Sequence, residues 1–216
     1  MVKKIILFTF SIAISTILVI FGYLWESPRD GQLLKPFFPK TLFSIENAPD
    51  QSLIGKVASV SGNVAWQSRT ANYAALISSP IKLQQGEEID AQNNGKAVIS
   101  FPGVGEITVF PNTQINFIQT LPANVVIEQK QGLSIYDKNG NIPISIRALD
   151  LLINPTEGTC TVSVDKDSTE IIVTVDSGSA TLAFNNINNV TNILTVKEGY
   201  EYIFNNNTKV GRLKSL

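Results

Sequence analysis

The only cysteine of this 216-residue chain, Cys160, stands in the stretch NPTEGTCTVSV (154–164). A thiol can act as a nucleophile or a redox switch when a neighbouring group lowers its pKa. The sequence contains no histidine, so the commonest activating base is missing. Cys160 alternates with Val162 and Val164, and this spacing places all three side chains on one face of a strand. We therefore expect Cys160 to be a buried apolar residue of the core.

Two groups of carboxylates are dense enough to raise the question of a metal or acid–base site. The segment DKDSTE carries Asp165, Asp167 and Glu170, and oxygen ligands at that density can hold Ca²⁺. Its spacing lacks the glycine and the distal glutamate of an EF-hand loop, so we expect a solvated hairpin tip. The second group consists of Glu87, Glu88 and Asp90. We expect these residues to be surface charges beside a turn.

Serine and aromatic residues offer two further candidates. No serine has a histidine partner and no G-x-S-x-G phrase occurs, which argues against a serine hydrolase at Ser59, Ser61 or Ser78. Aromatic side chains in strands either build the core or line a sugar- or peptide-binding face. The aromatic candidates are Trp66, Tyr73, Tyr136, Tyr200 and Tyr202. We predict no catalytic residue, no metal ligand and no cofactor, and hence a protein that is not an enzyme.

The composition narrows the class of protein. Charged residues make up 16% of the chain, below the usual level of about 25%, and the formal net charge is −1. A chain without a basic excess has no electrostatic basis for binding nucleic acid. A single cysteine allows neither an internal disulfide nor a cluster of thiolate zinc ligands.

The N-terminal residues predict a membrane anchor. Lys3 and Lys4 precede residues 5–24, a run of twenty residues without a charge. As a helix this run would span about 30 Å, the thickness of the hydrocarbon core of a bilayer. The alternative is a cleaved signal peptide, but no small-x-small cleavage site follows Leu24. We predict an uncleaved transmembrane signal anchor over residues 1–25, with the lysines in the cytoplasm and the following chain outside the cell or in the periplasm.

The rest of the chain divides into a tether, a β-domain and a tail. Residues 26–52 contain four prolines and read as a tether. Residues 53–205 consist of short apolar runs of period two that are separated by turn formers, which predicts an all-β domain built as a β-sandwich or a β-solenoid. Residues 206–216 are predicted to form a C-terminal tail. The runs that share this alternation are EITVF (106–110), IPISI (142–146), CTVSV (160–164), IIVTV (171–175) and ATLAF (180–184).

The order of these phrases resembles the FecR domain family over about residues 53–205. The family begins with a G-x-V-x-x-V-x-G-x-V strand, a Leu-x-x-Gly-acidic turn and a Pro-Asn-Thr phrase, and it continues with Gly-Thr and glycine-turn strand pairs. The matching segments are GKVASVSGNV (55–64), LQQGEEI (83–89), GKAVISF (95–101), PNTQINF (111–117), QGLSI (131–135), EGTCTVSV (157–164), IIVTVDSGSATLAF (171–184) and LTVKEGYEYIF (194–204).

This resemblance implies an extracytoplasmic β-domain carried on one membrane span. In regulators of this type the domain relays a signal from an outer-membrane receptor to a cytoplasmic sigma factor. Here only residues 1–4 precede the span, so we do not expect a cytoplasmic anti-sigma segment. We expect a membrane-tethered, non-catalytic module that binds a partner protein or a cell-envelope polymer. The alternative is a component that relays or regulates a signal through a partner.

Overall fold

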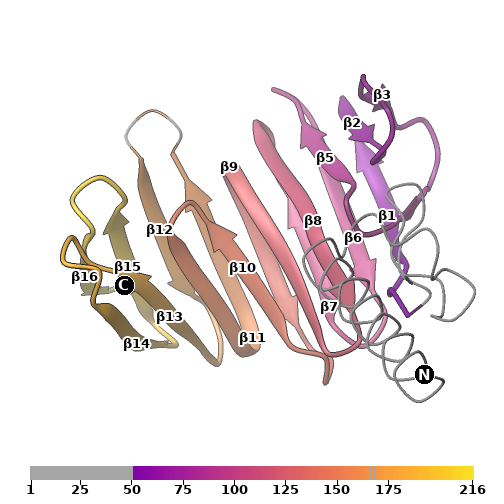
Figure 1. The fold of residues 1–216 in the computed structure, drawn as a ribbon. Coiled ribbons are helices and arrows are strands. Elements are labelled where there is room, and N and C mark those ends of the chain that lie inside the picture. Colours follow the sequence, from indigo (N-terminus) through magenta and orange to yellow (C-terminus); the bar gives the residue numbers. More distant parts are fainter. Residues whose placement is uncertain (1–50, 166, 168) are drawn as a thin grey trace, which may run out of the picture. The chain divides into compact units, whose positions relative to one another are not determined.

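The computed structural model describes residues 51–165, 167 and 169–216. This part of the chain consists of sixteen strands joined by turns and contains no helix (Figure 1). The prediction of an all-β domain is therefore confirmed. None of these residues belongs to a helix that could cross a membrane. The predicted span over residues 1–25, and the predicted tether up to residue 50, lie outside the described residues.

The strands form two hydrogen-bonded sheets, here named sheet A and sheet B. Every neighbouring pair in sheet A is antiparallel. Its spatial order is β4 (Lys82–Leu83), β1 (Gly55–Ser61), β6 (Lys96–Phe101), β7 (Gly105–Val109), β9 (Asn124–Lys138), β11 (Leu151–Val164), β12 (Glu170–Val175), β15 (Tyr200–Asn205) and β16 (Val210–Ser215).

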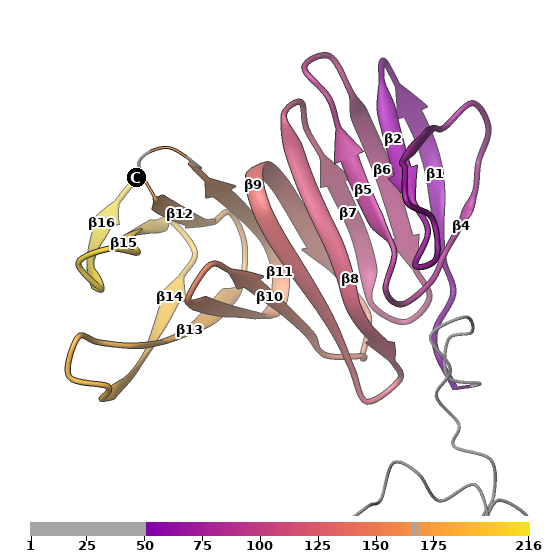
Figure 2. The same ribbon diagram turned by 45° about the horizontal axis from the view of Figure 1, so that its top comes forward.

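Sheet B forms the second layer and contains one parallel pair, between β9 and β10. Its spatial order is β3 (Ala75–Leu76), β2 (Val64–Gln67), β5 (Glu88–Ala91), β8 (Thr113–Leu121), β9, β10 (Ile144–Ala148), β11, β13 (Ser179–Asn185) and β14 (Thr191–Lys197). The chain passes repeatedly from one sheet to the other, and the two layers form a sandwich (Figure 2).

Strands β9 and β11 run through both sheets and join them. Strand β9 pairs with β8 up to Gln131 and with β11 from Gly132 onward. Strand β11 pairs with β13 up to Glu157, with β9 from Gly158 onward and with β12 from Cys160 onward. Gly132 and Gly158 have φ angles of 86° and 81°, which a residue with a side chain rarely adopts. Each glycine thus marks the position where its strand changes sheets.

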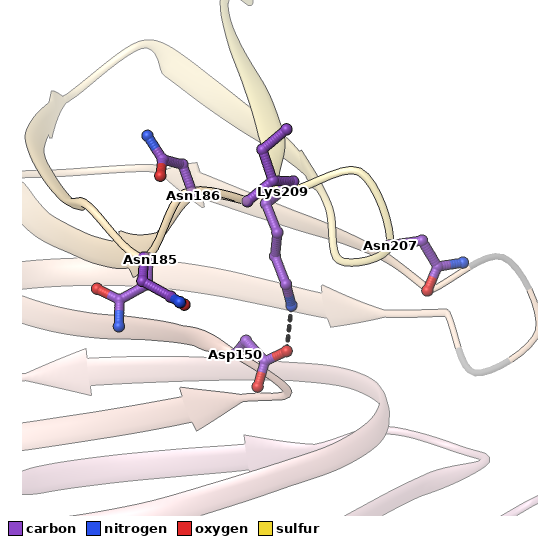
Figure 3. A pocket seen from close by; sticks show the side chains of 7 residues that line it. Asp150, Asn185, Asn186, Asn207 and Lys209 are labelled. Carbon is purple, nitrogen blue, oxygen red and sulfur yellow. Dashed lines mark hydrogen bonds and ion pairs between the residues drawn. The ribbon is translucent and has the colours of Figure 1, made fainter.

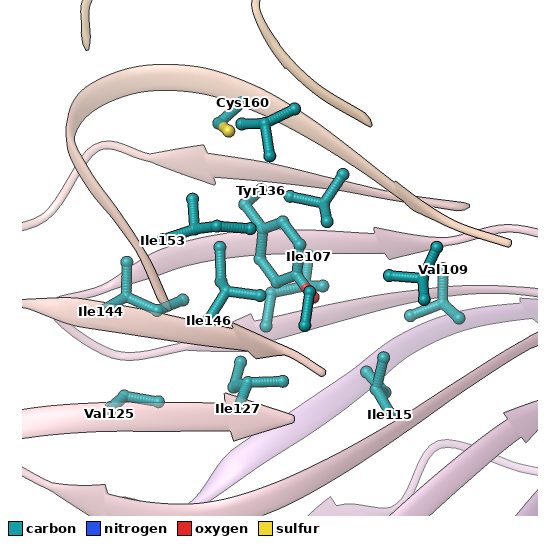
Figure 4. Packing of buried hydrophobic residues seen from close by; sticks show 14 of the residues in the cluster. Ile107, Val109, Ile115, Val125, Ile127, Tyr136, Ile144, Ile146, Ile153 and Cys160 are labelled. Carbon is teal, nitrogen blue, oxygen red and sulfur yellow. The ribbon is translucent and has the colours of Figure 1, made fainter. Parts of the chain in front are cut away.

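The inner faces of the two sheets build one hydrophobic core (Figure 4). Alternate residues of β12 and β13 are buried, as the period-two pattern predicts. The fully buried side chains of largest volume include Phe101, Phe117, Tyr136 and Phe204. The core extends along the whole sandwich, because residues from β1 to β15 belong to the same cluster.

A buried polar cluster stabilises the place where β9 changes sheets. The Gln129 side chain is fully buried, and its Nε2 donates to the carbonyl oxygens of Gly132 at 2.7 Å and Val162 at 3.0 Å. Its Oε1 accepts a hydrogen bond from the Tyr136 hydroxyl at 3.0 Å. Buried polar groups are costly unless they are paired. These three bonds therefore stabilise the crossing of β9 from one sheet to the other, because another path of the chain would leave the buried Gln129 side chain unpaired.

The two ends of the sandwich differ in their edge strands. At the end that contains β1, the edge strands β3 and β4 have two residues each. At the other end, β14 has seven residues and β16 has six. Strand β16 lies within the segment 206–216 that the sequence predicts as a tail, and it pairs with β15 along its whole length.

Candidate functional site

The structure places Cys160 in the core, as expected from its spacing. The residue is 2% exposed, and its strand neighbours Val162 and Val164 are buried on the same face. Its cross-strand partners are Tyr136 and Val175. Burial, with a smaller contribution from the charge of Asp176, raises the pKa of the thiol to about 12. A thiol with this pKa is protonated at neutral pH and is a poor nucleophile.

The carboxylates of the DKDSTE segment lie in the turn between β11 and β12. Asp165 and Asp167 are exposed, and the backbone N–H of Asp167 donates to Oδ1 of Asp165 at 2.9 Å. This bond is the usual local role of an aspartate in a turn. Among the described residues, no group of three His, Cys, Asp or Glu side chains is arranged to hold a metal ion.

The second carboxylate group is divided between the interior and the surface. Glu87 is only 6% exposed, which corrects the expectation of a surface charge. Its Oε2 accepts hydrogen bonds from Trp66 Nε1 at 3.1 Å and from the backbone N–H of Gln84 at 2.9 Å. The side chain therefore ties the β4–β5 turn to β2.

Glu88 and Asp90 are partly buried and alternate in β5 with two buried apolar residues, so they lie on the outer face of sheet B. Glu88 pairs with Lys130 and accepts a hydrogen bond from Gln114. Partial burial and the nearby charge of Glu88 raise the pKa of Asp90. Lys130 and Gln114 already bind the Glu88 carboxylate. We therefore interpret Glu88 and Asp90 as surface residues of sheet B and not as an acid–base pair.

The aromatic candidates do not form a common binding face. Tyr136 and Tyr202 are buried in the core, and the side chain of Trp66 is bonded to Glu87. Tyr73 is 86% exposed in the connection between β2 and β3, whereas Tyr200 is 41% exposed in β15. Ser59 and Ser61 are exposed in β1, and Ser78 is exposed in the connection between β3 and β4.

Three turns converge at the C-terminal end of the sandwich and form an open pocket of about 520 Å³ (Figure 3). They connect β10 to β11, β13 to β14 and β15 to β16. Lys209 forms an ion pair with Asp150, and Nζ of Lys209 also donates to Oδ1 of Asn206 at 3.2 Å. The hydrogen bond from Lys209 holds the pKa of Asp150 below its usual value. The pocket is lined by Asp150, Asn185, Asn186, Ile187, Asn189, Asn207 and Lys209.

The asparagines around this pocket mainly stabilise their own turns. Oδ1 of Asn186 accepts bonds from the backbone N–H groups of Asn188 at 2.9 Å and Val190 at 3.0 Å. Oδ1 of Asn205 accepts corresponding bonds from Asn207 and Thr208. Such bonds to nearby backbone N–H groups are the usual reason for an asparagine in a turn. The pocket therefore gives little reason to infer a small-molecule ligand.

The surface at this end carries more exposed apolar side chains than the rest of the described domain. Seven of the thirteen large apolar side chains that are exposed in the described chain lie between residues 187 and 216, which marks this end as a candidate contact surface. These residues are Ile187, Val190, Ile193, Tyr200, Val210, Leu213 and Leu216.

Strands β14 and β16 add unpaired backbone to this apolar surface. Each pairs with one neighbour only among the described strands, β13 and β15 respectively. The sequence signal for this surface is weak, because the run VGRLKS (210–215) is short and contains two charged residues. We define the C-terminal edge surface as β14, β16 and the exposed apolar residues between positions 187 and 216.

Two crystal structures of a protein described as a "putative anti-sigma factor" from Parabacteroides distasonis ATCC 8503, at 2.50 Å and 1.65 Å resolution, are similar to this chain. In both cases the TM-score is 0.50 and the sequence identity is 14%. The match covers 59% of this chain and 59% of that protein. At this identity the likeness concerns the fold alone. No protein-family model matches the sequence, and comparison with curated proteins finds no match.

Proposed function

We propose that this chain is a membrane-tethered, extracytoplasmic and non-catalytic module that binds a partner protein through its C-terminal edge surface. The observation that carries the proposal is the difference between the two ends of the sandwich. Natural sheets protect their edges with very short strands, which is how β3 and β4 end the sandwich on one side. Strands β14 and β16 are long and remain open to pairing.

The chemistry of this end favours a protein over a cell-envelope polymer as the partner. Exposed strand edges offer a regular row of backbone donors and acceptors, which another polypeptide can match. Exposed apolar side chains such as Ile193 and Val210, at 70% and 64%, would be buried by such a partner. A glycan site would need aromatic side chains on which sugar rings can stack. Of the exposed tyrosines of the described chain, Tyr73 and Tyr200, only Tyr200 belongs to the C-terminal edge surface.

The tether and the outward orientation rest on the N-terminal sequence. The uncharged run over residues 5–24 is long enough to span a bilayer, and two lysines precede it. A β-domain fixed near a membrane surface meets its partners at a high effective concentration. Tethering would therefore allow even a modest edge contact to be occupied in the cell.

Site-specific crosslinking in intact cells tests the proposal. A photo-crosslinking amino acid is placed at Leu213 or Ile193 in the C-terminal edge surface, and at Leu76 in β3 as the matched control on the opposite edge. We expect a discrete protein adduct from positions 213 and 193 and none from position 76. Equal adducts from all three positions, or no adduct from any, would count against a binding surface at this end.

Signal relay is a second candidate function, and the likeness to the Parabacteroides protein favours it. In that case the captured partner should itself cross the membrane or contact a protein that does. Removing the β-domain should then change the transcription of a defined set of genes. A partner confined to the cell envelope, together with unchanged transcription, would leave the binding function and exclude the relay.

A further inference from the structure

We propose that β16 is the strand to which the partner adds, and that the partner contributes an extended segment with alternating acidic and apolar side chains. This inference rests on the proposed function and specifies its contact. The segment would pair with the free edge of β16 through backbone hydrogen bonds, with its apolar side chains toward the inner face and its acidic side chains toward the outer face.

The backbone of β16 offers a regular set of free groups. The N–H of Leu216 donates to the carbonyl oxygen of Gly199 at 3.0 Å, and antiparallel residues alternate in the direction of their backbone groups. Residues of even number in β16 therefore bond to β15, and Gly211, Leu213 and Ser215 direct their N–H and C=O groups away from it. Strand β16 pairs with no other described strand, so these groups are open to a further strand.

The inner face of β16 provides a place for apolar side chains. Gly211 lies against the phenol of Tyr202, where a Cβ atom would come within 2.0 Å of the hydroxyl oxygen. The next inner-facing residue, Leu213, pairs with Tyr202 across the sheet and is still 52% exposed. Strand β14 lacks such a place, because its inner-facing Val196 is fully buried and Leu194 is packed on the core.

The outer face of β16 is basic and selects the charge of the partner. It carries Val210, Arg212 and Lys214. Lys214 pairs with Glu201 at 2.7 Å, whereas Arg212 has no ion-pair partner among the described residues. Opposite charges across neighbouring strands stabilise a sheet and like charges destabilise it. An acidic side chain opposite Arg212 is therefore favoured.

The same charges argue against a second copy of this chain as the added strand. In a symmetric antiparallel pairing centred on Leu213, Arg212 of one copy would lie opposite Lys214 of the other. Such a pair of cations on adjacent strands is unfavourable. A foreign acidic segment avoids this repulsion and neutralises Arg212.

Peptide binding to the full-length chain in detergent micelles tests this inference. The probe is a fluorescent peptide of four Glu–Val repeats, and the control peptide has four Lys–Val repeats. We expect the acidic peptide to bind at least tenfold more tightly, and to slow hydrogen exchange of the amides of Gly211, Leu213 and Ser215. Equal binding of both peptides, or protection located elsewhere, would overturn it.

Three variants separate backbone pairing from charge attraction. Leu213→Pro removes an outward-facing N–H and none of the bonds to β15, so it should abolish binding with the fold retained in circular dichroism. The matched control is Leu76→Pro in β3 on the opposite edge, whose N–H also faces outward because the neighbouring Ile77 bonds to Val64, and it should have no effect. Arg212→Glu changes an exposed side chain of the outer face, and it should weaken the acidic peptide about tenfold and favour the basic one.

The remaining outcomes decide between the inference and the function on which it rests. If the acidic peptide fails to bind while position 213 captures a protein partner in cells, strand addition is refuted and the binding function stands. If Leu213→Pro instead converts a dimer of the full-length chain into a monomer in light scattering, the occupant of the edge is a second copy and the inference is wrong.

Discussion

Cys160 contributes to the protein through its volume and its apolar character. Its sulfur packs in the core beside Tyr136 (Figure 4). Replacing it by serine would bury a hydroxyl without a partner, which costs about 1–3 kcal/mol. We expect Cys160→Ser to lower the free energy of unfolding by this amount in urea titrations, and Cys160→Ala to lower it less. Loss of partner binding in fully folded Cys160→Ser protein would contradict the purely structural role.

The Asp150–Lys209 pair should give the C-terminal turns a weak dependence on pH. The pKa of Asp150 is lowered in the folded protein, so the carboxylate contributes stability above its unfolded pKa of about 3.9 and loses it as the pH falls through the folded value. The side chain of Asp150 is 58% exposed, so the contribution is below about 1 kcal/mol.

Urea unfolding of the wild type and of Asp150→Asn between pH 6 and pH 3 measures this contribution. The wild type should be the more stable of the two at pH 6, and the difference should decrease as the pH falls below about 4 and shrink in high salt. A difference that stays constant over this range would assign the effect to packing rather than to charge.

The burial of single residues could be predicted from the sequence in one case, Cys160, and not in another, Glu87. The alternation of Cys160 with two valines was sufficient to place it in the core. Glu87 was expected at the surface because a carboxylate beside a turn is usually solvated. Its burial depends on Trp66, which is far away in the sequence and becomes a neighbour only when β2 pairs with β5. No local pattern contains that information.

At the scale of the elements, β9 and β11 hold the two sheets together. The sequence predicted the short alternating runs but not that Pro155 and Gly158 would lie inside one strand of fourteen residues. Proline and glycine usually end a strand. Here a register shift between Pro155 and Glu157 and the positive φ of Gly158 allow the strand to pass from sheet B to sheet A.

Substitution at this crossing should be more damaging than at an ordinary turn. A Cβ atom at Gly158 would lie 2.3 Å from the carbonyl oxygen of Ser177, whereas Gly199 has a similar φ of 79° with nothing within 4 Å. Gly199→Ala should cost about 1–2 kcal/mol from backbone strain alone. Gly158→Ala should cost about 1–3 kcal/mol more, because the backbone must shift. Equal losses in chemical denaturation would show that the crossing tolerates movement.

The buried cluster beside the crossing offers a second test of the same elements. Tyr136→Phe leaves Oε1 of Gln129 without the hydroxyl donor that it has in the folded protein. We expect a loss of about 1–3 kcal/mol in thermal and urea unfolding. Tyr200→Phe at a partly exposed position should change stability by less than about 0.5 kcal/mol. If both variants behave alike, the hydrogen bond to Gln129 has no role in fixing the crossing.

For the whole molecule, the sequence was sufficient to predict the fold class, whereas only the structure shows which end of the sandwich has open edges. Composition and period two were sufficient to predict an all-β domain over residues 53–205, because alternating burial is written along each strand. The end at which the sheets stay open was not predictable, since it depends on which strands become edges. The predicted membrane span stays a prediction, as it lies outside the described residues.

Labelling with a membrane-impermeant maleimide tests most directly whether the β-domain is held on the outer side of a membrane. Cys160 is buried and has a pKa of about 12, so Ser78→Cys in an exposed loop would carry the reactive thiol of the folded β-domain. In intact spheroplasts we predict rapid labelling of Ser78→Cys protein in the membrane fraction and no labelling of the wild type. Labelling that occurs only after the membrane is permeabilised, or a labelled protein found free of the membrane, would contradict the account.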